Sequence, residues 1–337
     1  MKETIEKLVE IFGPSGHEDE IRDLIRRIIE KEKLAGGKGD EVRVDAMGNL
    51  IVLKKGSGGG RKVMLAAHMD EIGVVVTHVD KKGFARFGRV GGLRPLTLMG
   101  GRVRFANGTI GVIGLEKLDD RSQTPGLEKF YIDVGATDKE SCPLRVGDLG
   151  GFIRPFAEAG RRLVSKAMDD RIGCAVLLQT LRDLKDSPHD VYFVFTVQEE
   201  VGLRGATTSG YGVAPDLALS IDVTTTGDTP EAHPMAVSLG DGPAIKVKDG
   251  GMLAHPGVKN WLIETAEAAE IPYQLEVLEG GTTDAMAIQT SRAGVPAGCV
   301  SIPCRYVHSP SEMVDYADVT NAVKLLAAAL SKPIELK

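Results

Sequence analysis

The sequence predicts an α/β fold, in which a doubly wound, largely parallel sheet carries helices on both faces and a small all-β domain is inserted. Two observations support this prediction. In residues 1–71 and 161–337, short apolar runs that suit buried strands alternate with longer segments of helical period. In residues 72–160 the pattern changes to short alternating runs separated by glycines and turns, with no helical period. We therefore expect the two ends of the chain to form one domain around an insertion.

The N-terminal part is expected to contain two helices and a hairpin. Apolar residues at helical spacing predict a helix over residues 2–12. Ser15 and Glu18 have the spacing of a capping box, which predicts that a second amphipathic helix begins there. Gly48–Asn49, which lies between two apolar runs, predicts a hairpin.

The remaining elements of the main domain alternate between strands and helices. Apolar runs predict buried strands at residues 63–67, 191–197, 217–221 and 299–302. Amphipathic segments predict helices at residues 171–184, at 258–270, after Asp284, and at 316–330. Such alternation is typical of a largely parallel sheet covered by helices.

The composition excludes several classes of protein. The 337 residues include 47 acidic and 41 basic side chains, for a net charge of −6, so the basic footprint of a general nucleic-acid binder is missing. No apolar window of about 18 residues predicts a membrane span, and acidic residues interrupt any signal-peptide pattern near the N-terminus. The four cysteines are scattered, which indicates a reduced cytoplasmic protein without a disulfide frame or a thiolate metal site.

Polar side chains follow each of the four predicted strands. In chain order they are His68 and Asp70, Glu199 and Glu200, Asp222, and His308. Because sites in open α/β sheets form outside the carboxyl ends of the strands, we expect these side chains to meet at one edge. Asp169 or Asp170, just before the helix at 171, can join them from a loop.

These residue types suit a pair of divalent cations. Imidazole and carboxylate without cysteine favour zinc, cobalt or manganese. Two such ions about 3.5–4 Å apart can share a water, lower its pKa toward about 7 and polarise a carbonyl. The available ligands are His68, one aspartate of the 169–170 pair, Glu200, Asp222 and His308. Glu199, next to a candidate ligand, is the candidate general base, and Asp70 is placed to accept the second N–H of the His68 imidazole.

Five segments that carry these residues resemble the tetrahedral aminopeptidases, which are co-catalytic dinuclear metallopeptidases related to glutamyl aminopeptidase. The segments are residues 66–73, 166–173, 198–202, 222–230 and 305–310. They occur in the same order and at similar intervals, and the resemblance spans nearly the whole chain.

The resemblance implies a role for each proposed ligand. Asp169 would bridge two metal ions, and His68 and His308 would be terminal ligands on different ions. Glu200 would share an ion with one histidine, and Asp222 would share an ion with the other.

The resemblance also implies roles around the ions. Glu199 would act as general base and then as general acid, and Asp70 would orient His68. The segment 280–285 resembles a glycine-rich loop that lines the substrate site in the family, so Gly281, Thr282 and Thr283 are candidate substrate-binding residues.

For the whole protein, the resemblance implies an aminopeptidase that hydrolyses N-terminal residues from short peptides. It would use two divalent ions per subunit, which would be zinc or cobalt, and manganese is also compatible. Residues 1–71 and 161–337 would form the catalytic α/β domain. Residues 72–160 would form a barrel-like domain for oligomerisation. Members of the family form dimers and then a tetrahedral dodecamer, so self-association is expected here.

Other interpretations remain open from the sequence. Asp169 or Asp170 could cap the helix that follows, and Glu199–Glu200 could lie in a solvated loop. The same metal core could serve a deacylase or a carboxypeptidase. A metal-independent glycosidase using Glu199 and a second carboxylate, or a non-catalytic assembly protein, would belong to other classes.

Overall fold

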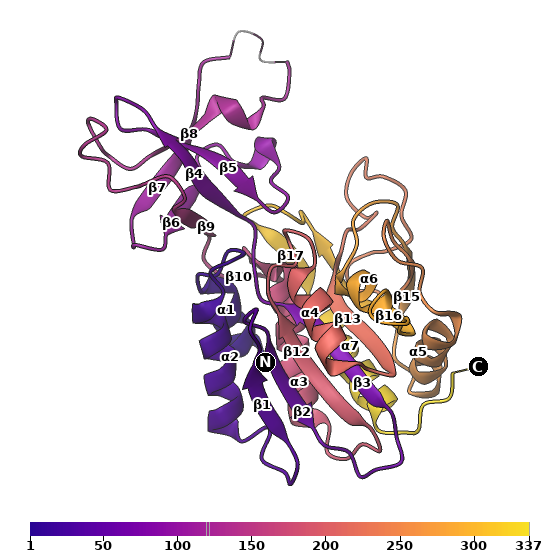
Figure 1. Ribbon diagram of the computed structural model, residues 1–337. Coiled ribbons are helices and arrows are strands. Elements are labelled where there is room, and N and C mark those ends of the chain that lie inside the picture. Colours follow the sequence, from indigo (N-terminus) through magenta and orange to yellow (C-terminus); the bar gives the residue numbers. More distant parts are fainter. Residues whose placement is uncertain (119, 121, 337) are drawn as a thin grey trace.

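The computed structural model describes residues 1–118, 120 and 122–336. Figure 1 shows a large sheet flanked by helices and, beside it, a separate barrel of strands. The helices are α1 (Lys2–Glu10), α2 (Asp19–Glu32), α3 (Met168–Asp183), α4 (Arg204–Val213), α5 (Pro256–Ala268), α6 (Asp284–Gln289) and α7 (Tyr316–Leu330). Among the described helices, none combines the length and the apolar composition needed to cross a membrane.

The large sheet has a parallel centre and antiparallel flanks. Its strands are β1 (Glu41–Val44), β2 (Leu50–Lys54), β3 (Lys62–His68), β10 (Ala157–Ala159), β11 (Arg162–Ser165), β12 (Asp190–Thr196), β13 (Leu217–Thr224), β14 (Ala244–Lys248), β15 (Gln274–Val277), β16 (Ala297–Arg305) and β17 (Glu312–Asp315). Their order is β1-β2-β12-β3-β13-β16-β17-β11-β10, with β14 and β15 branching from β16. The neighbours β12, β3, β13 and β16 are parallel, as predicted. The expected hairpin forms β1 and β2, which join the sheet in antiparallel register.

Helices cover both faces of this sheet, which explains the uninterrupted apolar strands. In β3, Val63, Leu65 and Ala67 belong to a core cluster shared with α1, α2, α3 and α7. Met64 and Ala66 belong to a second cluster shared with α4 and α6. Because successive side chains of a strand point to opposite faces, both sets must be apolar. The prediction of helices on both faces is therefore confirmed.

The insertion is a closed barrel with its own core. Its strands are β4 (Gly73–Val79), β5 (Ala85–Val90), β6 (Arg102–Phe105), β7 (Ile110–Leu115), β8 (Phe130–Asp133) and β9 (Leu149–Ile153), with 3-10 turns η1 (Pro95–Thr97) and η2 (Leu127–Lys129). They close in the order β4-β5-β8-β7-β6-β9 through antiparallel pairs. The side chains of Val74, Phe105 and Ile132 lie in a core cluster separate from those of the large sheet.

The capping box expected at the start of α2 does not form. The helix begins at Asp19, and no side chain caps its first turn. Ser15 Oγ instead donates to Asp70 Oδ2 at 2.6 Å, and Glu18 Oε1 accepts from the Gln198 main-chain N–H at 3.1 Å. The two polar residues therefore connect the N-terminal segment to the ends of β3 and β12.

A buried cluster of charged side chains connects α1 to the sheet and to α3. Glu71 accepts hydrogen bonds from Lys166 Nζ at 2.7 and 2.8 Å and from Arg171 Nη2 at 3.1 Å. Both cations also donate to main-chain carbonyls at the end of α1, including that of Ile11. All three charged side chains are almost completely buried. Removing one partner of such a cluster leaves uncompensated charge in the interior.

We expect Glu71→Ala to destabilise the fold by about 3–5 kcal/mol, because Lys166 and Arg171 would remain buried without their carboxylate. The free energy of unfolding can be measured by urea denaturation. The matched control is Glu158→Ala, which removes the carboxylate of an exposed ion pair with Lys2 and should shift the midpoint little. Equal midpoints for the two variants would contradict this account.

Candidate metal centre

The proposed ligands converge at the carboxyl ends of the central strands. His68 is the last residue of β3, and Asp222 lies near the end of β13. Glu200 follows β12, and His308 lies in the loop between β16 and β17. Asp169 enters from the first turn of α3, where its own backbone is not helical.

Asp169 lies between the two imidazoles. Its Oδ1 is 3.0 Å from His68 Nε2, and its Oδ2 is 3.3 Å from His308 Nε2. Glu200 Oε2 is also 3.3 Å from His308 Nε2, and Asp222 Oδ1 is 4.0 Å from His68 Nε2. The structure thus brings all five side chains together, with one oxygen of Asp169 toward each histidine.

Glu199 lies at the edge of the same cluster. Its Oε2 is 3.8 Å from His68 Nε2, and its side chain is 12% exposed. The Glu199 side chain therefore contacts the cluster and is also slightly exposed to solvent. A carboxylate there can reach a molecule bound beside the imidazoles.

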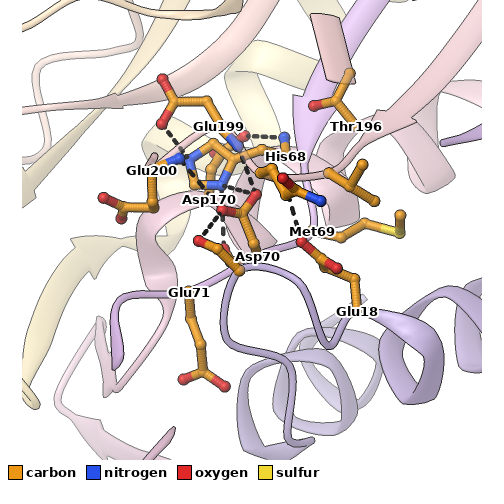
Figure 2. A network of polar contacts seen from close by, with 12 residues as sticks. Glu18, His68, Met69, Asp70, Glu71, Asp170, Thr196, Glu199 and Glu200 are labelled. Carbon is orange, nitrogen blue, oxygen red and sulfur yellow. Dashed lines mark hydrogen bonds and ion pairs between the residues drawn. The ribbon is translucent and has the colours of Figure 1, made fainter. Parts of the chain in front are cut away.

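Asp70 contacts His68 and also holds the segment that carries the two glutamates (Figure 2). The His68 Nδ1 atom lies 3.1 Å from the Asp70 carbonyl oxygen and 3.5 Å from Asp70 Oδ1. The Asp70 carboxylate accepts the main-chain N–H groups of Glu199 at 3.0 Å and Glu200 at 3.2 Å. It also accepts the Ser15 hydroxyl. One buried carboxylate therefore connects β3, the end of β12 and the N-terminal segment.

Asp169 and Asp170, which the residue pattern alone left open and of which the family resemblance selected Asp169, have different surroundings. Asp170 Oδ1 accepts the Gly173 main-chain N–H at 3.1 Å, as a helix cap does, and its Oδ2 accepts the His68 N–H at 3.2 Å. Asp169 is the aspartate that faces both imidazoles. The peptide bond between the two aspartates is cis.

The buried carboxyl groups of this site would be stabilised by nearby positive charge. Burial raises the pKa of Glu199 and that of Asp222 well above their usual range. Burial disfavours the charged form of His308, yet hydrogen bonds with Asp169 and Glu200 outweigh this effect and raise the pKa of the imidazole to about 11. Burial likewise opposes ionisation of Asp169, but the two imidazoles hold its pKa below the usual value.

The residues present fit divalent cations. The groups His68–Asp169–Glu200 and His68–Asp170–Asp222 each offer three ligand atoms within 4.8 Å of one another. Glu200 Oε1 is buried and has no hydrogen-bond partner in the described part of the chain, which leaves it free for a cation. Imidazole nitrogen and carboxylate oxygen are donors that zinc and similar ions accept.

The candidate substrate loop precedes Asp284, whose carboxylate accepts the hydroxyl of Thr196 at the end of β12. Thr282 lines a cavity of about 860 Å³ together with Gly202 and Met286. Thr283 is buried, and its hydroxyl lies 2.8 Å from that of Ser220 and caps α6. Gly281 has φ of +67°, and its carbonyl accepts the N–H of residue 250.

The barrel also reaches the site, through the glycine pair that follows β5. A Cβ atom at Gly92 would lie 2.3 Å from His308 Nδ1, and one at Gly91 would lie 2.9 Å from Glu200 Oε2. Only glycine lets the main chain approach this closely without moving its neighbours. Nothing in the sequence distinguishes this pair from the other glycine-rich turns of the insertion.

Imidazoles and carboxylates gathered at the carboxyl edge of an α/β sheet are typical of metal-dependent hydrolases. Comparison with known proteins narrows this class. The model of the M42 glutamyl aminopeptidase family matches residues 48–325. The chain belongs to this family, and it is accordingly a metal-dependent aminopeptidase that removes N-terminal residues.

Individual relatives are similar over almost their whole length. The lysyl aminopeptidase of Pyrococcus furiosus is 35% identical over 350 residues, which cover 99% of this chain and 98% of that protein. The solved structure of an aminopeptidase from Desulfurococcus kamchatkensis is 44% identical, covers 98% of this chain and 94% of its own, and has a TM-score of 0.91. The PhTET1-12s structure, a dodecamer, is 32% identical, with coverage of 98% and 99% and a TM-score of 0.87.

The contact between the barrel and the candidate ligands leads to a prediction. We expect Gly92→Ala to weaken metal binding about 10–100-fold, because the new methyl group displaces the His308 ring. Metal affinity can be measured by competition with a chromophoric chelator. The control is Gly88→Ala on β5, where a Cβ would meet only ordinary contacts at 3.5 Å. Unchanged affinity in Gly92→Ala would show that the close approach has no role in the site.

Proposed function

We propose that this aminopeptidase acts on short peptides through two divalent ions held by His68, Asp169, Glu200, Asp222 and His308. The observation that carries the proposal is the position of the Asp169 carboxylate, with one oxygen toward each imidazole. A carboxylate between two sets of ligands suits a bridging role. Zinc or cobalt, with manganese also compatible, would fit these donors.

The distances support a division of the ligands. His68 and Asp222 would share one ion with Asp169, because their ligand atoms are 4.0 Å apart. His308 and Glu200 would share the other ion with Asp169, because theirs are 3.3 Å apart. When bound, two such ions lower the pKa of a shared water and polarise the scissile carbonyl.

Glu199 would move the proton in this reaction. Its carboxylate would take a proton from the attacking water and then deliver it to the leaving amine. Its backbone is held by the hydrogen bond from its N–H to Asp70 Oδ1. Asp70 would thus position the base as well as orient His68. The surrounding carboxylates also suit the positively charged amino terminus of a peptide.

The rest of the chain would provide the substrate site and the assembly. Gly281, Thr282 and Thr283 would line the substrate site, and residues 1–71 and 161–337 would form the catalytic domain.

Residues 72–160 would mediate dimers and a tetrahedral dodecamer. The exposed apolar side chains of Leu96, Met99 and Val146 on the insertion support self-association. The four unpaired cysteines support a reducing, cytoplasmic location.

A panel of aminoacyl-coumarin amides with acidic, basic and neutral residues, measured with zinc, cobalt and manganese, tests the proposal. We expect at least one residue type to be released, and chelation to abolish the activity until metal is restored. Amino-blocked analogues should not be cleaved. Full activity in chelator, or cleavage of blocked substrates alone, would contradict the proposal.

We expect Glu199→Gln to lower kcat by about 10²–10⁴, because the amide cannot accept the proton of the water. Metal content, measured by mass spectrometry, and the thermal midpoint should stay close to those of the unmodified protein. Turnover within a few-fold of the unmodified protein, with metal retained, would exclude Glu199 as the base.

A further inference from the structure

A basic hollow lies at the seam between the barrel and the large sheet. It has a volume of about 500 Å³. Arg94, which follows β5, and Arg154, which follows β9, contribute from the insertion. Tyr306 and Ser309 contribute from the loop that carries His308. Residues from both domains that line the hollow are therefore close in sequence to residues at the proposed metal centre.

The close approach of Gly92 to His308 places this hollow near the centre in space. The Gly92 main chain packs so tightly that a Cβ atom would lie 2.3 Å from His308 Nδ1. Arg94 is two residues further along, so its Cα lies within about 7 Å of that of Gly92. An extended peptide advances about 3.3–3.6 Å per residue, so a few residues can span from the centre to the hollow.

The charge of the hollow is unbalanced. Neither the Arg94 nor the Arg154 guanidinium makes a hydrogen bond or an ion pair within residues 1–118, 120 and 122–336, and both residues are exposed. Arg104 differs, because it pairs with Glu20 at 3.4 Å and stacks on a phenylalanine ring. Arg26, on α2, likewise pairs with Glu30 at 2.8 Å.

The chemistry of the lining is that of an anion site. No aspartate or glutamate is among the described residues that line the hollow, although acidic residues exceed basic ones in this chain. Tyr306, Ser309 and Ser311, which carry hydroxyl groups, also line it. A guanidinium presents paired N–H donors that match the two oxygens of a carboxylate.

We propose that this hollow is a subsite for a carboxylate of the peptide substrate, which is either the C-terminal carboxylate of a short peptide or an acidic side chain. Arg94 and Arg154 bind the carboxylate while the scissile bond lies at the metal centre. The inference rests on the proposed function and adds to it a determinant of substrate choice. A bound C-terminal carboxylate also limits the length of peptide that fits.

Three pairs of substrates, each differing by one carboxylate, test the subsite. The first pair is Leu-Gly-Gly with a free or an amidated C-terminus. The second is Leu-Glu-amide and Leu-Gln-amide, and the third is the coumarin amide of glutamate and that of glutamine. The ratio of kcat/KM within each pair is measured for the metal-loaded protein, for R94Q/R154Q, and for R26Q/R104Q, which changes the net charge equally.

For the unmodified protein we expect that, in at least one pair, kcat/KM is about tenfold higher for the substrate that carries the carboxylate. A charge-assisted hydrogen bond supplies a preference of this size. The pair that shows it identifies the source of the carboxylate. R94Q/R154Q should bring that ratio close to one, whereas R26Q/R104Q should keep it. Ratios near one in every pair, or a preference that survives in R94Q/R154Q, would overturn the subsite while leaving the proposed function intact. No hydrolysis of any substrate with any metal would overturn the proposed function as well.

Discussion

The candidate site is built around carboxylates that are concentrated at one water-poor edge of the sheet. Asp169, Glu199, Glu200 and Asp222 approach two imidazoles closely, and burial makes their ionised forms costly. Such an arrangement persists only where rigid strands hold it and positive charge compensates it. The parallel strands supply the rigidity, because helices cover both of their faces. Divalent cations are the natural source of the compensating charge in a metallopeptidase family.

The inserted barrel extends this arrangement beyond the catalytic sheet. Its Gly91–Gly92 segment packs on His308 and Glu200, so an element expected to serve assembly also shapes the site. The same segment continues into the seam that holds Arg94 and Arg154. The candidate ligands, the proposed subsite and the barrel proposed to mediate assembly are therefore physically connected. If barrels associate as proposed, a change in that association would reach the candidate ligands through this contact.

The sequence predicted the four central strands, every described helix except α4, and the convergence of the polar residues, because apolar runs mark buried strands and parallel strands place their carboxyl ends together. It did not predict the flanking strands β10, β11, β14, β15 and β17, which are short or less apolar. The residue pattern alone did not separate Asp169 from Asp170, and only the family resemblance selected Asp169, since both precede the same helix and the backbone path decides which one faces the imidazoles. The capping interpretation of Ser15 failed because a hydroxyl that donates to a distant carboxylate has the same local pattern. The contact of Gly92 with His308 depends on tertiary packing between two domains, which no local pattern encodes.

Anomalous diffraction from crystals of the zinc-loaded protein would locate the bound ions. We expect two anomalous peaks, one on each side of the Asp169 carboxylate. One peak should lie beside His68 and Asp222, and the other beside His308 and Glu200. A single peak, or peaks away from these five side chains, would contradict the account.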